Sequence, residues 1–398
     1  MNIKSKKILC LLIFCNLFIN MGAVCALDNS GHQQNHKLIG NDTKSNNAIV
    51  INQQTSQKHN LSNKGSDANG LGTFEDLDKK IQEAILNHDS IIHLDKNYKY
   101  VYSDGFKLKN GILIKKNIII DGNGHTIDGN GVARAFQIEC PIEIKDITIK
   151  NTNSACGSAI YSTNYVDLRN ANLCNNNATH DAGAIYCGSL NIVDCDFENN
   201  VALGNGGAIY SEGYVNVDEF GGMCKFFGNT ADEGGAIYTC GSVNVNHTDF
   251  TCNKASENGG AIYSINDVKL VGCGFALNLV CDDDGDGGAI YTTGHNINLT
   301  HNVFTSNCAN SRGGVIYCGD DDSHISLVDN GFSGNVCKSH KGSLYKGVVV
   351  FTDGYFDKIY SNWWGTPNPS WDCGLLVKNK FWSSEIHKDD SPRSQPVN

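Results

Sequence analysis

A pentapeptide that recurs along the chain constrains the fold more than any other feature of the sequence. Its copies read GSAIY, AGAIY, GGAIY, GGVIY or KGSLY, and they end at Tyr161, Tyr186, Tyr210, Tyr238, Tyr263, Tyr291, Tyr317 and Tyr345. Successive copies lie 24 to 28 residues apart. Self-similarity at this period is typical of a solenoid, in which each unit buries its apolar side only by stacking on its neighbours.

A second motif precedes most of these tyrosines at a nearly constant distance. It is FxxN or LxxN, and its asparagine stands 9 to 13 residues before the tyrosine, at Asn176, Asn200, Asn229, Asn253, Asn278, Asn307 and Asn335. Aligned asparagines in stacked β-structure can hydrogen-bond to one another through their amides. The spacing therefore predicts an asparagine ladder at one turn of the solenoid.

Each repeat reads as short strands, because residues 189–197 and 241–250 alternate apolar and polar side chains and are rich in β-branched residues. A pair of helices with its turn needs more residues than one interval supplies. Three strands of about four residues fit. If the isoleucines of the pentapeptide face the core, each following tyrosine faces outward, and the Gly pair supplies a turn with positive φ.

The fold class that follows is all-β, a right-handed parallel β-helix solenoid. Thr73, with Asp76 three residues later, predicts the capped start of an amphipathic helix that covers the first coil. We assign residues 1–26 to a signal peptide, 27–70 to a disordered polar spacer, 71–373 to the β-helix with its N-terminal cap, and 374–398 to a C-terminal tail.

The composition limits the partners of the exported chain. Lys4, Lys6 and Lys7 precede an apolar run that is too short to span a membrane, so the sequence predicts secretion and no integral membrane segment. Without this leader the chain keeps 28 basic and 42 acidic residues, a formal charge of −14. Nucleic acid is excluded as a partner, since phosphate binding needs the opposite sign.

The repeats resemble those of two families of surface proteins. GGAI and FxxN motifs are similar to the repeats of chlamydial polymorphic membrane proteins. The chain also resembles adhesin-like surface proteins of methanogenic archaea over roughly residues 71–373, including GILIKKNIIIDGNGHTIDGNG from Gly111 and NWWGTPNP from Asn362. The resemblance implies a pectate-lyase-like right-handed β-helix and a role in adhesion or display at the cell surface or cell envelope.

One insertion carries a candidate metal site. The repeat between Asn278 and Tyr291 is longer than its neighbours, and the excess is the loop DDDGDGG from Asp282. Asp282, Asp284 and Asp286 alternate oxygen ligands as calcium loops do, but the glutamate that closes an EF-hand is absent at its expected place. Calcium binding and a solvated acidic loop both stay open, and no other cofactor is indicated.

Cysteines and sequons supply two further sets of candidates. Cys195 and Cys224 each stand two residues before a phenylalanine on consecutive repeats, which suits either a disulfide or two buried free thiols. Asn177, Asn246 and Asn298 begin NxT sequons that are candidates for glycosylation in an exported protein.

The function expected from these patterns is a non-enzymatic, adhesin-like protein that presents a repetitive surface to extracellular glycans or cell-surface proteins. The candidate binding strip is the outward column that includes Tyr186, Tyr210, Tyr238, Tyr263, Tyr291 and Tyr317. The alternative use of these rings is to cover the sheet and stabilise one another. A polysaccharide lyase or glycoside hydrolase, and a structural component of the envelope, are the other functions considered.

Overall fold

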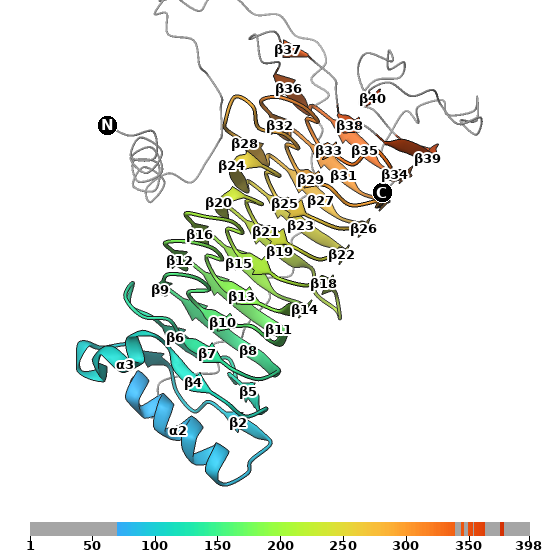
Figure 1. The fold of residues 1–398 in the computed structure, drawn as a ribbon. Helices are drawn as coiled ribbons and strands as arrows, with labels where there is room; N and C mark the ends of the chain where they lie inside the picture. Colours follow the sequence, from blue (N-terminus) through green and yellow to red (C-terminus); the bar gives the residue numbers. More distant parts are fainter. Residues whose placement is uncertain (1–69, 339–343, 346–348, 353, 363–374, 378–398) are drawn as a thin grey trace, which may run out of the picture. The chain divides into compact units, whose positions relative to one another are not determined.

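The computed structural model describes residues 70–338, 344–345, 349–352, 354–362 and 375–377. The predicted signal peptide and all of the predicted spacer except residue 70 lie outside these residues, as does most of the predicted C-terminal tail. Within them the chain is a parallel β-solenoid, in which strands pair in parallel with the strands one repeat away (Figure 1). The pairing between residues 336–338 and 344–345 is antiparallel. The predicted solenoid of parallel strands is therefore confirmed.

The strands belong to three sheets. The sheet that carries the pentapeptide has 11 strands, namely β4 (Ile112–Ile114), β7 (Phe136–Ile138), β10 (Ile160–Ser162), β13 (Ile185–Cys187), β17 (Ile209–Ser211), β21 (Ile237–Thr239), β25 (Ile262–Ser264), β29 (Ile290–Thr292), β33 (Ile316–Cys318), β38 (Val350–Thr352) and β40 (Leu375–Val377). We call it the tyrosine sheet. A sheet of 9 strands follows the asparagine motif and contains β9 (Asn153–Ser154), β12 (Asn177–Ala178), β16 (Val201–Ala202), β20 (Thr230–Glu233), β24 (Lys254–Asn258), β28 (Leu279–Val280), β32 (Cys308–Ala309), β36 (Val336–Lys338) and β37 (Leu344–Tyr345).

The third sheet has 20 strands, because most coils contribute two strands to it. One column contains β2 (Ile91–His93), β5 (Ile119–Asp121), β8 (Ile142–Lys150), β11 (Tyr165–Cys174), β14 (Ser189–Val193), β18 (Val215–Asp218), β22 (Val243–Asn246), β26 (Val268–Val271), β30 (Asn296–Thr300), β34 (His324–Val328) and β39 (Tyr355–Tyr360). The other contains β1 (Gly72–Thr73), β3 (Tyr98–Lys99), β6 (Thr126–Asp128), β15 (Asp196–Glu198), β19 (Cys224–Phe227), β23 (Thr248–Thr251), β27 (Gly274–Ala276), β31 (Val303–Thr305) and β35 (Gly331–Ser333). We call this sheet the wide sheet.

A typical coil thus has four strands, and the expectation of three was wrong. The extra break lies within the wide sheet, where one residue per coil has a positive φ, for example Asp194 at 53°, His247 at 42° and His301 at 57°. A left-handed residue bends the chain and interrupts the alternation of a strand. Its side-chain types are Asp, Asn, His and Gly in different repeats, so no single letter marks this bend in the sequence.

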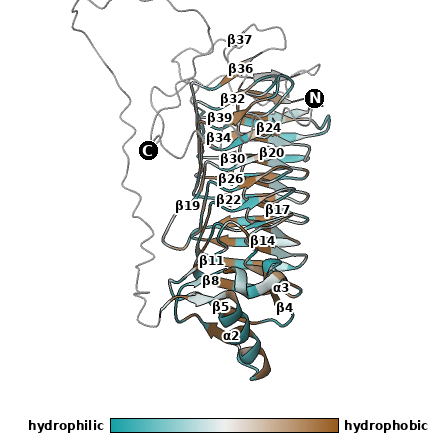
Figure 2. Cartoon of the chain, turned by 90° about the vertical axis from the view of Figure 1, so that its left-hand side faces the viewer, coloured by the Kyte–Doolittle hydropathy of each residue, from teal (hydrophilic) through white to brown (hydrophobic). Residues whose placement is uncertain are grey.

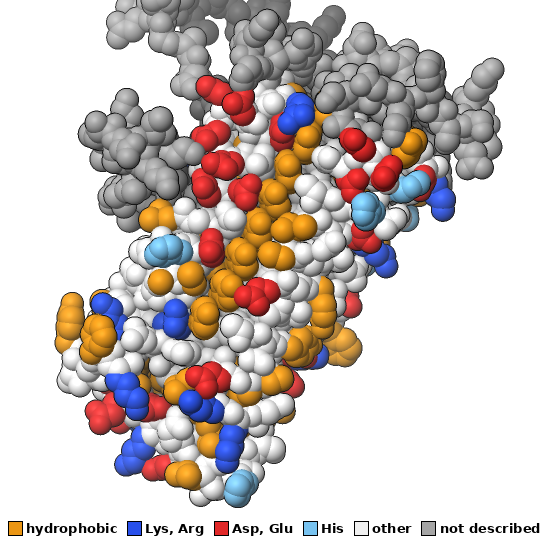
Figure 3. All heavy atoms as spheres, in the orientation of Figure 1, with side chains coloured by type: hydrophobic (Ala, Val, Ile, Leu, Met, Phe, Trp, Pro, Cys, Tyr) orange, Lys and Arg blue, Asp and Glu red, His pale blue; other side chains and the backbone are white. Residues whose placement is uncertain are grey.

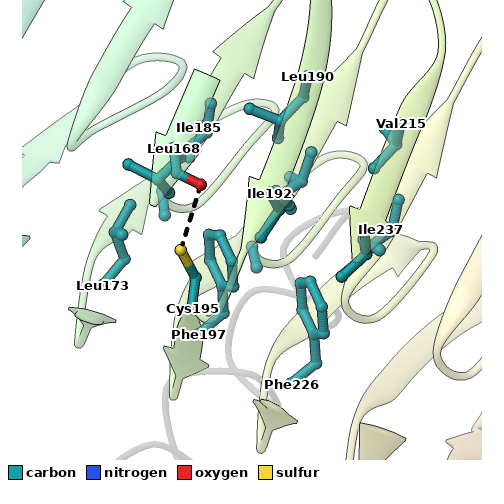
Figure 4. Packing of buried hydrophobic residues seen from close by; sticks show 14 of the residues in the cluster. Leu168, Leu173, Ile185, Leu190, Ile192, Cys195, Phe197, Val215, Phe226 and Ile237 are labelled. Atoms are coloured by element: carbon teal, nitrogen blue, oxygen red, sulfur yellow. Dashed lines mark hydrogen bonds between the residues drawn. The ribbon is translucent and has the colours of Figure 1, made fainter. Parts of the chain in front are cut away.

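The core is built from identical side chains stacked along the solenoid. Ile185, Ile209 and Ile237 pair in register and are fully buried, as predicted. The phenylalanines of the FxxN motif form a second column from Phe197 to Phe332, with ring centroids 4.6–5.1 Å apart. Figure 4 shows part of this packing, and Figure 2 shows polar residues alternating with apolar ones along the strands. The burial of these columns supplies the hydrophobic stabilisation of the stack.

The predicted asparagine ladder is confirmed. From Asn176 to Asn307, each side-chain amide donates to the Oδ1 of the next asparagine at 2.9–3.1 Å. The same Oδ1 accepts the backbone N–H of the preceding ladder residue, and the second amide hydrogen binds a carbonyl of the coil before, such as Phe226 O at 2.9 Å from Asn253. The side-chain oxygen and amide of these buried asparagines thereby have hydrogen-bond partners, as buried polar groups require.

The two glycines of the pentapeptide have different roles, although one role was expected for the pair. The first has positive φ, as at Gly206 (71°) and Gly234 (60°), and Ala182 adopts the same conformation at 60°. The second has no positive φ, but a Cβ on Gly207 would collide with the carbonyl oxygen of Gly235 in the next coil. Close approach of backbones, and not the turn, therefore requires glycine at the second position.

A helix lies at the beginning of the described chain. α2 (Phe74–Leu86) has the capping box predicted for Thr73 and Asp76, with Thr73 Oγ1 accepting from Asp76 N at 3.1 Å and Asp76 Oδ2 accepting from Thr73 N at 2.9 Å. Its buried side chains include Phe74, Leu77 and Ile81, and it contacts the strands β1 to β4. η2 (Tyr102–Asp104) and α3 (Gly105–Lys109) follow. Among the described residues, no helix has both the length and the apolar composition needed to cross a membrane.

Candidate binding surface

The outward tyrosines form a continuous column of stacked rings, as the alternation of the pentapeptide predicted. The neighbouring centroids lie 4.6–5.1 Å apart with interplanar angles of 3–21°, and the column contains Tyr161, Tyr186, Tyr210, Tyr238, Tyr263, Tyr291 and Tyr317. Phe351 continues it, 5.4 Å from Tyr317. The side chain of Tyr345, the last tyrosine of the motif, lies outside the described residues. We call this feature the tyrosine column.

Stacking limits how much of each ring the column presents. Tyr238 and Tyr317 are only 9% and 6% exposed, and the other tyrosines are half-buried. Since neighbouring planes are nearly parallel, the faces of the inner rings are turned toward one another. Figure 3 shows a narrow apolar band between polar flanks on the face that carries the tyrosine sheet. The outer surface of the band therefore consists mainly of ring edges and hydroxyl groups.

A row of polar side chains runs beside the tyrosine column, at the residue before each glycine pair. It contains Asp181, Asn205, Glu233, Asn258, Asp286 and Arg312, and we call it the pre-glycine row. Asn205 donates its backbone N–H to Asp181 at 2.8 Å and its side-chain amide to Glu233 at 3.3 Å. Asn258 donates to the other oxygen of Glu233 at 3.2 Å. Acids and amides thus alternate from coil to coil.

This row was not predicted from the sequence. Its members differ in type, so no constant letter marks the position, and only their common place directly before the glycine pair connects them. These residues can be found only after the repeats are aligned on a different motif. Aligning the repeats on the glycines shows carboxylates on every second coil at Asp181, Glu233 and Asp286.

Burial changes the acid–base behaviour of the groups in this surface. Burial raises the pKa of Glu233, although the hydrogen bond from Asn258 acts in the opposite direction. Burial, followed by the carboxylate of Glu233, raises the pKa of Tyr238 to about 12. The pKa of Tyr186 is also raised, by burial and by its hydrogen bond to Glu212, which accepts from the hydroxyl at 2.7 Å. These tyrosines therefore stay neutral near pH 7, and the hydroxyl of Tyr186 donates a hydrogen bond.

Two arginines of the protein lie against the ends of the tyrosine column. The guanidinium carbon of Arg134 is 5.0 Å from the ring centroid of Tyr161. That of Arg312 is 4.4 Å from the centroid of Tyr317 and 5.2 Å from that of Phe351. All three distances lie within the range at which cations and aromatic rings attract.

The acids of the candidate calcium loop are not brought together. Asp286 is buried, and its carboxylate accepts from Arg312 at 2.5 Å (Nη2) and 3.2 Å (Nε) and from the Arg312 backbone at 2.8 Å. Asp282 is half-buried and Asp284 is exposed. No group of three or more His, Cys, Asp or Glu positioned to hold a metal ion occurs within the described part of the chain. Calcium binding stays a prediction.

Cys195 and Cys224 lie on adjacent coils, as their spacing predicted, and both are free thiols in the structure. Cys195 donates its backbone N–H to Cys224 Sγ at 3.1 Å, and its own thiol contacts the carbonyl oxygen of Leu168 at 3.5 Å (Figure 4). Burial raises the pKa of both thiols, that of Cys224 to about 12. A disulfide between them stays a prediction.

The register of these cysteines reveals a second asparagine ladder that was not predicted. Three repeats after Cys224 the same turn position holds Asn302, and the next two repeats hold Asn330 and Asn362. The side-chain amide of Asn302 donates to Asn330 Oδ1 at 3.0 Å, and that of Asn330 donates to Asn362 Oδ1 at 3.1 Å. Cys273, at this position too, donates its backbone N–H to Asn302 Oδ1 at 2.8 Å. Cysteine therefore occupies the place of a buried ladder residue here.

The three sequons differ in accessibility. Asn177 and Asn298 have exposed side chains, whereas Asn246 is half-buried. Thr248, the threonine of the Asn246 sequon, is fully buried and donates its hydroxyl to the carbonyl of Asn246 at 2.8 Å. Asn177 and Asn298 are thus the more accessible candidates for glycosylation.

Comparison with known proteins supports the repeat and not a specific relative. The Chlamydia polymorphic membrane protein (Chlamydia_PMP) repeat matches residues 194–212, 224–240 and 303–319. No curated protein and no solved structure matches the chain. The matched segments hold ladder asparagines and column tyrosines, for example Asn229 with Tyr238 in the second segment. The chain is a repeat-containing β-solenoid, and three of its segments are similar to this repeat.

Proposed function

We propose that the protein is a non-enzymatic, adhesin-like component of the cell surface, and that the tyrosine column with the pre-glycine row is its binding surface. The observation that carries the proposal is the continuity of the column over seven consecutive coils. An extended aromatic strip flanked by polar groups is typical of a contact surface, and a repeated surface favours extended partners over one small substrate. Polymorphic-membrane-protein repeats, named for membrane proteins, support a surface location.

The proposal is tested by altering the column while keeping the coils. Replacing Tyr210, Tyr238 and Tyr263 by Ser removes three adjacent rings. The control replaces Asn216, Asn244 and Lys269 by Ser, because these residues lie on the same coils but on the outer side of the wide sheet. Folding is checked by circular dichroism, and attachment to cells and to glycan arrays is measured.

We expect the tyrosine variant to lose attachment and the control to keep it. Equal attachment by two folded variants would remove the column from the binding mechanism. The same preparations are incubated with uronate and neutral polysaccharides and assayed for new reducing ends and for unsaturated products. Turnover by the wild-type chain would replace the proposal with an enzymatic function.

A further inference from the structure

At one end of the tyrosine column, a side chain of the protein itself lies against the rings. The chemistry of this side chain indicates which ligands the column can bind. Arg312 places a guanidinium beside the rings of Tyr317 and Phe351, and the same group binds both carboxylate oxygens of Asp286 in the coil before. A guanidinium held between a carboxylate and aromatic rings combines a charge-assisted hydrogen bond with attraction to the rings. This end of the surface is therefore a filled site for a cation.

Two carboxylates earlier in the pre-glycine row have the register of Asp286 without its arginine. Asp181 and Glu233 also stand five residues before a column tyrosine, but the following coils carry Asn205 and Asn258 where Arg312 stands. Asp181 accepts the backbone N–H of Asn205, and Glu233 accepts the side-chain amides of Asn205 and Asn258, so the acids receive neutral hydrogen bonds here. Among the described residues, neither carboxylate forms an ion pair with Lys, Arg or His. The negative charge at these two positions is therefore not balanced by a neighbouring cation.

The coils that carry the column are acidic as a whole. Residues 151–338 contain 6 Lys and Arg against 21 Asp and Glu, a net charge of −15. A surface of one sign attracts and orients partners of the opposite sign. Charge complementarity thus selects a basic partner, and the ring edges of the column offer apolar contact to the aliphatic stems of Lys and Arg.

The geometry points to an extended, basic segment of a partner protein as the ligand of the tyrosine column, with Lys or Arg side chains binding Asp181 and Glu233. This inference rests on the proposed binding function of the same surface and names its ligand class. The two carboxylates lie two coils apart, which corresponds to roughly 10 Å at the usual strand spacing. In a polyproline II segment, residues three apart lie about 9.3 Å apart on the same side. A basic residue at every third position of such a segment matches this spacing.

The experiment uses the full chain and two synthetic peptides. The probe is a fluorescent peptide of repeated Arg-Pro-Pro, and the control peptide replaces each Arg by Gln. Binding is measured by anisotropy at low and high salt. The test variant is Asp181→Asn with Glu233→Gln, and its matched control is Asp167→Asn with Asp218→Asn, which removes the same charge from the wide sheet. Circular dichroism verifies that both variants fold.

We expect the Arg peptide to bind the wild type and the control variant, with an affinity that falls as salt rises. The test variant should bind about tenfold more weakly, because two partly exposed ion pairs are lost. Equal affinity for the Gln peptide, or unchanged affinity of the folded test variant, would overturn the inference.

The same variants distinguish a failure of this inference from a failure of the proposed function on which it rests. If the triple tyrosine variant loses cell attachment while the Asp181 and Glu233 variant attaches normally, the surface binds a partner that is not basic, and only the present inference fails. If both attach like the wild type, the proposed function fails as well.

Discussion

The first coils and the coils that bear the tyrosine column share a backbone and differ in chemistry. In the first coils the column position holds Leu113 and Gln137: Leu113 pairs in register with Gln137, and Gln137 pairs with Tyr161. Residues 70–150 contain 11 basic and 12 acidic residues, whereas residues 151–338 contain 6 and 21. The solenoid therefore does not need tyrosines or acids on this face. Because these residues recur regularly after residue 160 without being required by the fold, we propose that those coils carry the binding surface.

The asparagine ladder also begins where the first coils give way to the coils that bear the tyrosine column. Its first asparagine, Asn176, accepts from Thr152 Oγ1 at 2.7 Å, so a threonine ends the ladder at the edge of the repeating coils. The side chain of Thr152 hydrogen-bonds to the ladder residue of the following coil, whereas the side chain of a ladder asparagine hydrogen-bonds to the coils before and after it. The repeating coils are thus tied to one another by side chains as well as by strands.

The largest expected effect comes from a charge in the repeating core. Ile237→Asp should abolish folding of the repeating coils, because an unpaired buried charge costs several kcal/mol and both neighbouring coils lose their contact. Ile114→Asp in β4 should unfold the first coils and leave later coils structured, since a solenoid unit contacts only its neighbours. Circular dichroism and limited proteolysis distinguish these outcomes. The control is Asn244→Asp on the outer side of β22, and equal loss of structure in all three variants would contradict the comparison.

A smaller effect is expected from the ladder. Asn253→Ala removes hydrogen bonds to Asn229, Asn278 and Phe226 O, and should lower the free energy of unfolding by about 2–4 kcal/mol because buried groups lose their partners. Thr152→Val at the end of the ladder should cost about 1 kcal/mol. Urea denaturation measures both values. Equal costs would show that the ladder contributes no more inside the repeating coils than at their edge.

The smallest effect concerns pH. The pKa of Glu233 is raised by burial in the folded chain, so the folded state holds this proton more tightly than the unfolded state. Its contribution to stability is present below the unfolded pKa of about 4.3 and is lost as pH rises through the raised folded pKa. Glu233→Gln should therefore gain stability relative to the wild type over this pH range. Thermal melts at several pH values test this, with Glu139→Gln in the first coils as the matched charge change. Parallel curves for wild type and Glu233→Gln would refute it.

Most of the architecture was predictable because it depends on side chains that recur at fixed spacing. Ile237 and Phe250 had to face inward, since alternation within a strand assigns each residue to one side. Asn253 had to meet Asn229 and Asn278, because stacking the coils places corresponding motif positions above one another. Those inferences need only periodicity, which the sequence displays directly.

The tertiary structure decided what periodicity does not contain. The bend at Asp194 depends on backbone dihedrals that Asp, His and Gly all adopt, so three strands were predicted where four occur. Asp286 entered an ion pair with Arg312, 26 residues away, and not a loop with Asp282 and Asp284. The pre-glycine row joins unlike side chains, and only the close approach of successive coils makes neighbours of them. Sequence alone therefore determined the repeat and its buried ladder, whereas the charges and hydrogen bonds of the proposed binding surface were set by contacts between coils.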